Sequence, residues 1–200
     1  MKYDPTKHHR RSIRLPGYDY ASPGAYFVTI VTYHHACLFG KIQNDEMQLT
    51  NLGQIVEEYW RDISEHFPNV ELGTFLVMPN HIHGIIILHA DAIRDLVSTP
   101  EILNNHARRG VVSTPIITVP QGDETSPLQR PTLGQVVAYF KYQSTKQINT
   151  ILDSAGTPVW QRSYYEHIIC NYIEHERIHL YIESNPVNWM DDDENPEIIR

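Results

Sequence analysis

One stretch of the chain, residues 77–88, constrains its fold more than any other. An apolar run typical of a buried β-strand follows the turn residues Met78-Pro79-Asn80. Within the strand, His81 and His83 flank Ile82. Side chains alternate between the two faces of a strand, so both histidines point to one face while Ile82 points into a core. Two imidazoles about 7 Å apart on one strand face can bind a single metal ion.

Patterns elsewhere in the chain predict both strands and helices. Strands are expected at 25–33, 40–43, 47–50, 70–77, 81–89 and 160–167, and helices at 51–66, 132–150 and 168–184. The strands at 40–43 and 47–50 form a hairpin around Asn44-Asp45. This order predicts an α+β fold, namely a ferredoxin-like antiparallel sheet covered by helices on one face.

Charge and composition divide the chain into a domain with distinct extensions. The formal net charge is −8, which by itself argues against nucleic acid as a partner. Its distribution is uneven: the arm at 1–17 is basic, and the tail at 191–200 has five acidic side chains and one arginine. Between them we expect one domain at 18–190. Five of the thirteen prolines lie at 91–131, which we interpret as a mobile insertion.

Several classes of protein are disfavoured. The polar, basic N-terminus does not resemble a secretion signal. The longest apolar run, Gly84 to Leu88, is far too short to span a bilayer. Two cysteines do not indicate a disulfide framework. We therefore expect a cytoplasmic protein that does not bind membranes.

The last predicted helix presents two faces of different character. Tyr181 and Asn185 are four residues apart and therefore lie on one face, together with Arg177. A second, apolar stripe is suited to packing on the sheet: Ile169, Ile173 and Leu180. Tyr181 lies outside this stripe, so it is either a buried tyrosine of another contact or a functional one.

The same helix contains a possible zinc peptidase motif, His175-Glu176-x-x-His179. Such a site needs a third ligand, but no histidine follows the motif. Arg177 also places a positive charge inside it, which disfavours a divalent cation. In addition, a peptidase leaves His81 and His83 without a role.

A nucleophilic tyrosine accounts for more of these residues. Cleavage of a phosphodiester needs a nucleophile and a cation that polarises the phosphate. A metal held by His81, His83 and the side-chain oxygen of Asn185 places that phosphate beside the Tyr181 hydroxyl. Nitrogen and oxygen ligands together favour Mg²⁺ or Mn²⁺ over a closed structural zinc site. Arg177 is positioned to contact the phosphate or the phenolate.

Together these motifs resemble those of HUH single-tyrosine transposases, in the branch of the REP-associated tyrosine transposases. His81-Ile82-His83 resembles the histidine–hydrophobic–histidine motif, and Tyr181-x-x-x-Asn185-Pro186 resembles the nucleophile helix. Further matching segments are Arg14 to Tyr20, Gly24 to Thr29, Trp160 to His167, and Asn185-Pro186-x-x-Trp189. The resemblance covers residues 10–192 except the insertion.

This resemblance implies a ferredoxin-like fold and a homodimer that acts on single-stranded, hairpin-forming DNA. It implies that Tyr181 is the nucleophile and becomes joined to a 5′ phosphate while a 3′ hydroxyl is released. His81 and His83 are then metal ligands, with Asn185 as the third. The chain departs from the pattern at Cys170, where this branch leads us to expect a basic residue.

DNA binding is expected to use basic side chains for phosphates and aromatic side chains for unpaired bases. The candidates are Arg10, Arg11, Arg14, Lys141, Lys146 and Arg177. The sequence leaves a second hypothesis open, in which the protein is a domesticated regulator that binds DNA hairpins with little strand transfer.

Overall fold

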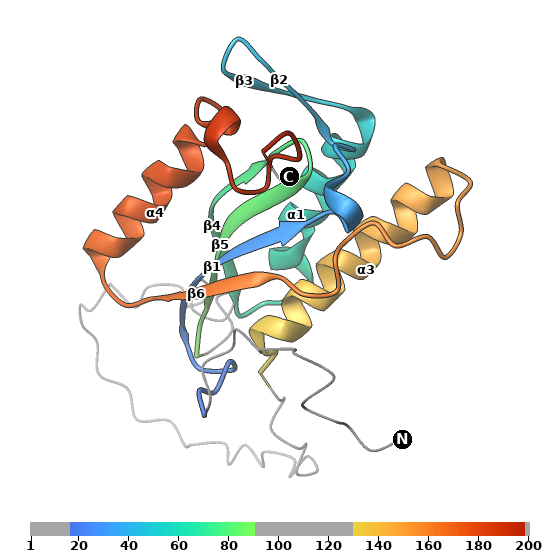
Figure 1. The fold of residues 1–200 in the computed structure, drawn as a ribbon. Coiled ribbons are helices and arrows are strands. Elements are labelled where there is room, and N and C mark those ends of the chain that lie inside the picture. Colours follow the sequence, from blue (N-terminus) through green and yellow to red (C-terminus); the bar gives the residue numbers. More distant parts are fainter. Residues whose placement is uncertain (1–16, 91–129, 199–200) are drawn as a thin grey trace, which may run out of the picture.

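The structure is a computed structural model, and it describes residues 17–90 and 130–198 (Figure 1). Residues 1–16 of the predicted arm and 91–129 of the predicted insertion lie outside the described part. The described elements are β1 (Gly24–Val31), η1 (Tyr33–His35), β2 (Gly40–Gln43), β3 (Glu46–Leu49), α1 (Asn51–His66), β4 (Val70–Val77), β5 (His81–Leu88), α3 (Leu133–Ile151), β6 (Tyr165–Ile169), α4 (Tyr172–Ser184) and η2 (Trp189–Asp191).

Four strands form one antiparallel sheet in the order β4-β5-β1-β6. With α1 leading into β4 and α3 leading into β6, this is the βαββαβ order of a ferredoxin-like fold, which confirms the predicted fold class. The predicted hairpin is also present as β2 and β3. Its two turn residues, Asn44 and Asp45, have positive φ angles of 54° and 61°, as a tight two-residue hairpin turn requires.

Helices α1 and α3 cover one face of the sheet and enclose the larger core. Alternate residues of β1 and β5 point into it, among them Val28, Ile30 and Ile82. Trp60 of α1 is fully buried in this core and lies directly over Gly84. A Cβ atom at Gly84 would lie 2.3 Å from the Trp60 ring, so glycine is required for α1 to approach β5.

Helix α4 covers the opposite face, as Figure 1 also shows. Its buried residues, Ile178 and Ile182, pack against Phe27 and Ile85 in a small second core. The prediction that helices cover only one face is therefore wrong. The alternation along β5 sends Ile82 to the α1 side and the two flanking histidines to the α4 side, as predicted.

The predicted packing stripe is wrong at two of its three residues, since only Ile169, at the end of β6, packs against the small core. Ile173 is 81% exposed and Leu180 is 61% exposed. The last strand is Tyr165–Ile169 rather than 160–167, and the helix starts at 172 because the side chain of Asn171 accepts a hydrogen bond from the Glu174 amide. The other two helices begin as predicted, capped by the Thr50 and Thr132 side chains.

Across the described residues, 17–90 and 130–198, the helices are too short or too polar to cross a membrane.

Candidate active site

The two histidines of β5 face each other on the α4 side of the sheet. His81 Nε2 lies 3.0 Å from His83 Nε2, and both side chains are buried. Burial lowers the pKa of His81 from 6.5 to about 3, and it also lowers the pKa of His83. Both imidazoles are therefore neutral at neutral pH, which is the form that binds metal ions.

Asn80 determines which nitrogen of His81 carries the proton. The amide nitrogen of Asn80 donates to two backbone carbonyls, at 2.6 Å to Glu194 and 3.3 Å to His35, which fixes the orientation of the amide. Its oxygen therefore faces His81 Nδ1 at 2.9 Å and accepts a hydrogen bond from it. A neutral imidazole has one N–H, so His81 Nε2 presents a lone pair to the site. His83 Nδ1 lies 2.9 Å from the Thr29 hydroxyl in a similar supporting contact.

Asp192 is a third potential ligand, and the sequence pattern did not predict it. Its carboxylate and the imidazole nitrogens of His81 and His83 all lie within 4.8 Å of one another, and all three side chains are buried. The carboxylate accepts hydrogen bonds from Asn185 Nδ2 at 3.0 Å and from the Glu194 amide at 2.7 Å. These two contacts hold Asp192 in place beside the histidines.

Asn185, the predicted third ligand, is buried next to this cluster. Its amide nitrogen donates a hydrogen bond to the Asp192 carboxylate, while its oxygen is buried without a hydrogen-bond partner among the described residues. An unpaired buried carbonyl oxygen is costly unless something else binds it. The ligand role of Asn185 stays a prediction, and Asp192 adds a charged oxygen ligand that fits the same role.

This set of side chains fits a divalent metal ion. Two neutral imidazoles and one carboxylate, all supported by further hydrogen bonds, are a common ligand set for divalent transition metals. The buried, unpaired oxygen of Asn185 points to the same conclusion. Mn²⁺ accepts this mixture of ligands more readily than Mg²⁺, which prefers oxygen.

Tyr181 lies at the edge of the histidine pair. Its hydroxyl is 3.4 Å from His83 Nε2, and its ring packs edge-on against Phe27 with centroids 6.0 Å apart. The side chain is 47% exposed, so one side of the phenol is open to solvent. Burial of the other side and the carboxylates of Asp192 and Asp193 raise the pKa of Tyr181 to about 12. The predicted convergence of phenol and imidazoles is present within one chain.

The segment after α4 is tied to the start of β5. Besides the contact from Asn80 to the Glu194 carbonyl, the Glu194 carboxylate lies 3.2 Å from His35 Nδ1. Asn195 is buried and donates to the Trp189 carbonyl at 2.9 Å. The Trp189 ring lies 6.1 Å from the His81 ring, centroid to centroid. Residues predicted as an acidic tail thus include part of the site.

The predicted DNA-binding residues differ in their surroundings. Lys141 is partly buried: its ammonium donates to the carbonyls of Gln161 and Ser163 at 3.0 Å each, and burial lowers its pKa to about 8. Lys146 is exposed, and Arg177 is exposed beside Glu174, at 3.7 Å. Their DNA contacts stay predictions. The candidates Arg10, Arg11 and Arg14 lie outside the described residues.

The peptidase motif does not form a metal site in the described part of the chain. His175 and His179 belong to no cluster of three potential ligands there. His179 Nδ1 is instead hydrogen-bonded to the Thr74 hydroxyl on β4. His179 therefore contributes to the contact between α4 and the sheet.

The fold can be compared with that of known structures. The structure is similar to that of a REP-associated tyrosine transposase bound to a REP hairpin, with a TM-score of 0.54 and 17% sequence identity. The match covers 90% of this chain and 74% of the transposase chain. The protein therefore has the fold of a tyrosine transposase.

Sequence comparison places the chain in a family. No protein-family model matches it. A protein of Haemophilus influenzae, described as an uncharacterized protein, is 38% identical over 191 residues, which is 96% of either chain. The chain belongs to the same family as this Haemophilus protein.

Proposed function

We propose that the protein is a divalent-metal-dependent enzyme that cuts and rejoins single-stranded DNA, with Tyr181 as its nucleophile. The observation that carries this proposal is the position of the phenol, 3.4 Å from His83 Nε2 in the same chain. The similar fold of a transposase bound to a hairpin supports hairpin-forming DNA as the substrate. Because one chain supplies phenol and imidazoles together, the homodimer implied by the sequence resemblance is not needed to complete the site.

Three side chains would hold the metal ion: His81 and His83 through Nε2, and Asp192 through its carboxylate. The side-chain oxygen of Asn185, which has no hydrogen-bond partner among the described residues, is a further potential metal ligand beside them. When bound, a divalent cation neutralises the phosphate and stabilises the negative charge that develops during cleavage. We expect Mn²⁺ to support the reaction at least as well as Mg²⁺.

In the proposed reaction, Tyr181 exchanges one phosphodiester bond of the DNA for a bond to its own oxygen. Its oxygen attacks the phosphorus, and the bond from phosphorus to the 3′ oxygen breaks. The phenolic proton ends on that oxygen, which leaves as a 3′ hydroxyl. The strand is then joined to Tyr181 through its 5′ phosphate, and attack by a 3′ hydroxyl reverses the step. The exposed side of the phenol allows the strand to approach.

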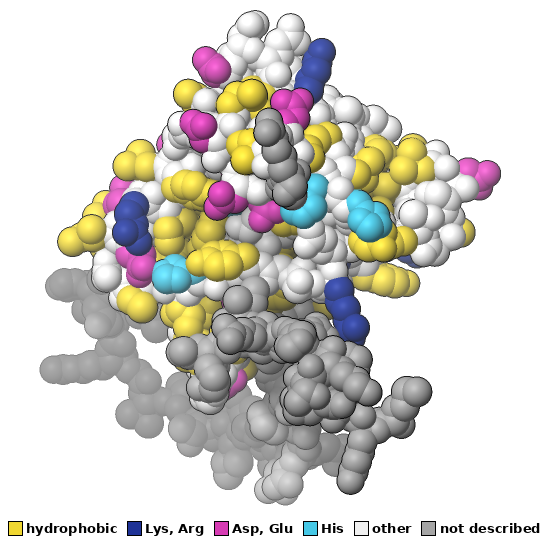
Figure 2. Space-filling model, viewed as in Figure 1, with side chains coloured by type: hydrophobic (Ala, Val, Ile, Leu, Met, Phe, Trp, Pro, Cys, Tyr) yellow, Lys and Arg dark blue, Asp and Glu magenta, His cyan; other side chains and the backbone are white. Residues whose placement is uncertain are grey.

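The charge around the site supports a reaction that depends on metal. Asp191, Asp193 and Glu194 flank the buried Asp192 along the chain. Figure 2 shows several acidic side chains on this face of the molecule. These charges repel a phosphate and disfavour the phenolate of Tyr181. A divalent cation bound at the histidine pair would offset both effects.

The test is a covalent adduct with DNA. The protein is mixed with a labelled hairpin oligonucleotide that has single-stranded extensions, in Mn²⁺ or Mg²⁺, and denatured before electrophoresis. The wild-type protein should give a labelled band at the mass of protein plus DNA, and Tyr181→Phe should give none. EDTA should also abolish the band.

Tyr165 offers a matched control. It is 48% exposed and packs on the same Phe27, with ring centroids 6.1 Å apart. Tyr165→Phe should therefore retain the adduct. An adduct that persists in Tyr181→Phe contradicts the proposal, and tight hairpin binding without any adduct favours a DNA-binding regulator.

A further inference from the structure

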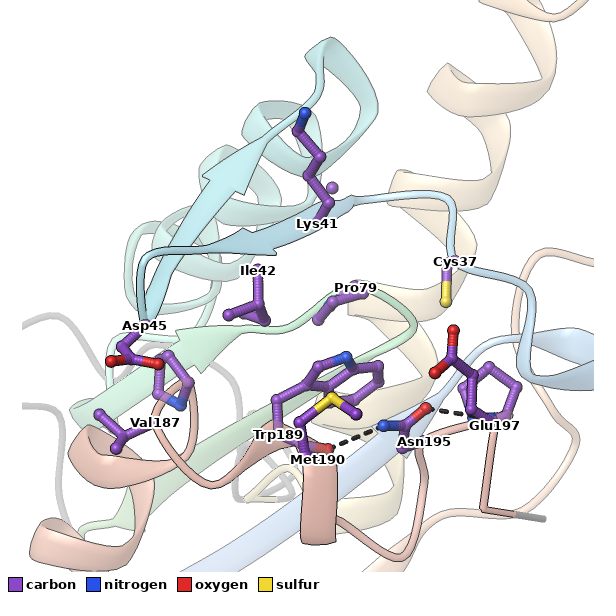
Figure 3. A pocket seen from close by; sticks show the side chains of 13 residues that line it. Cys37, Lys41, Ile42, Asp45, Pro79, Val187, Trp189, Met190, Asn195 and Glu197 are labelled. Atoms are coloured by element: carbon purple, nitrogen blue, oxygen red, sulfur yellow. Dashed lines mark hydrogen bonds between the residues drawn. The ribbon is translucent and has the colours of Figure 1, made fainter.

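A second concave site lies next to the histidine pair. A cavity of about 340 Å³ separates the β2–β3 hairpin from the segment that follows α4 (Figure 3). This volume is within the range of pockets that bind small organic groups. None of the residues to which the proposed cleavage assigns a role lines the cavity.

The middle of the cavity is apolar and aromatic. Figure 3 shows Trp189 and Met190 on one wall, with Ile42 and Pro79 across from them. Trp189 is partly buried, so one part of the indole is accessible. A flat aromatic group placed between these walls gains contact with the indole and with the methionine side chain.

The ends of the cavity are acidic. Asp45 lies at one end and Glu197 at the other, while the side chain of Lys41 leads away from the cavity (Figure 3). Carboxylates repel phosphate but accept hydrogen bonds from N–H groups. The occupant is therefore expected to be an aromatic group with N–H donors rather than a stretch of phosphate backbone.

The cavity lies beside the candidate active site. Trp189 lines it and lies 6.1 Å from His81, centroid to centroid. Pro79 lines it directly before Asn80, whose side chain orients His81. A nucleotide whose phosphate lies at the histidines can therefore turn its base toward Trp189.

We propose that this cavity binds one unpaired nucleobase of the DNA strand, adjacent to the phosphate that Tyr181 attacks. The inference rests on the proposed function for its substrate class. Exocyclic amino groups of adenine, cytosine and guanine can donate to Asp45 or Glu197. The one N–H group of thymine, at N3, lies between two carbonyl oxygens, which a carboxylate repels. The cavity thus selects an amino-bearing base next to the cleaved bond.

The test uses the tetranucleotides dA4, dC4, dG4 and dT4 as probes, with Mg²⁺ and the Tyr181→Phe protein to prevent cleavage. The readout is the indole N–H signal of Trp189 in NMR spectra, assigned with Trp189→Phe. Trp60 and Trp160 are buried in the other core and serve as internal controls. We expect the Trp189 signal alone to shift and saturate, with a dissociation constant at least fivefold higher for dT4.

A cavity-filling variant tests the location without altering Trp189. Ile42→Tyr should raise the dissociation constant for the amino-bearing tetranucleotides about tenfold or more, which is the effect of losing one stacked base. Ile151→Tyr makes the same substitution on the exposed end of α3 and should leave binding unchanged.

Three results overturn the proposal: no saturable shift of Trp189, an equal shift with an abasic tetramer, or unchanged binding in Ile42→Tyr. Failure of the proposed cleavage would give a different result. The wild-type protein would form no covalent adduct, while the Trp189 signal would still respond to the tetranucleotides. If the adduct forms normally but the Trp189 signal does not respond, only the proposal of a base-binding cavity is contradicted.

Discussion

The two faces of the sheet differ in what they bury. The face under α1 and α3 is closed by large apolar side chains, including Trp60, Phe140 and Ile86. The face under α4 has a small apolar core, beside which lie neutral imidazoles, a buried carboxylate and a half-exposed phenol. The first face provides most of the apolar burial that stabilises the fold. The second face can therefore carry polar groups that lower stability but can bind metal.

The largest expected effect on the free energy of unfolding comes from the face under α1 and α3. Trp60 is fully buried and packs edge-on against Phe140, with ring centroids 5.2 Å apart. Trp60→Ala should lower the free energy of unfolding by about 3–5 kcal/mol, measured by urea denaturation. Tyr181→Phe, which keeps its ring on Phe27, should change it by less than about 0.5 kcal/mol. Equal losses in both variants would show that the faces do not differ in this way.

The polar groups on the face under α4 should make the free energy of unfolding depend on pH in the metal-free protein. The pKa of His81 falls from 6.5 to about 3 on folding. Between these values the unfolded chain binds a proton that the folded chain does not, so the free energy of unfolding rises with pH and is lost on acidification. The loss should reach a few kcal/mol between pH 6.5 and 3 in EDTA. The double variant His81→Gln and His83→Gln should show a flatter dependence, and an unchanged slope contradicts the prediction.

A smaller effect is expected from the groups that orient the imidazoles. Asn80→Leu removes the acceptor for His81 Nδ1 and should weaken Mn²⁺ binding about 10–100-fold, measured by calorimetry. The ¹⁵N NMR shifts of His81 should show a change in the protonated nitrogen. Thr29→Val is a matched test at His83. Unaltered Mn²⁺ affinity in Asn80→Leu means that the tautomer is set by something else.

The smallest effect is expected on the outer surface of α4. Ile173 and Leu180 are exposed, so Ile173→Ser and Leu180→Ser should each change the free energy of unfolding by less than about 0.5 kcal/mol. Ile182→Ser, on the buried side of the same helix, should cost several times more. A large loss in Ile173→Ser would indicate that a partner covers this surface.

Local rules explain why much of the fold was predictable. Thr50 and Thr132 precede apolar periodic segments, and each caps one of the helices that the sequence predicts at 51–66 and 132–150. Asn44 and Asp45 tolerate the positive φ angles of a tight turn. The end of the chain was harder, because Asn171 rather than the apolar pattern decides where α4 begins.

Asp192 shows why part of the site escaped prediction. It lies among five acidic residues of the last ten, a composition that is typical of a solvated tail. Nothing in its neighbours distinguishes it from Asp191 or Asp193. Its burial follows from the turn after α4 and from contacts with Asn185 and the Glu194 amide, which bring it back to β5.

The sequence by itself determined the shared direction of His81 and His83, because alternation along a strand is a property of the backbone. It also determined the order of strands and helices, which depends on local periodicity and caps. Only the tertiary structure decided which side of α4 is buried, that Tyr181 meets His83 in one chain, and that Asp192 joins them. These choices depend on contacts between residues about a hundred positions apart in the chain, and local sequence patterns contain no information about which distant residues meet.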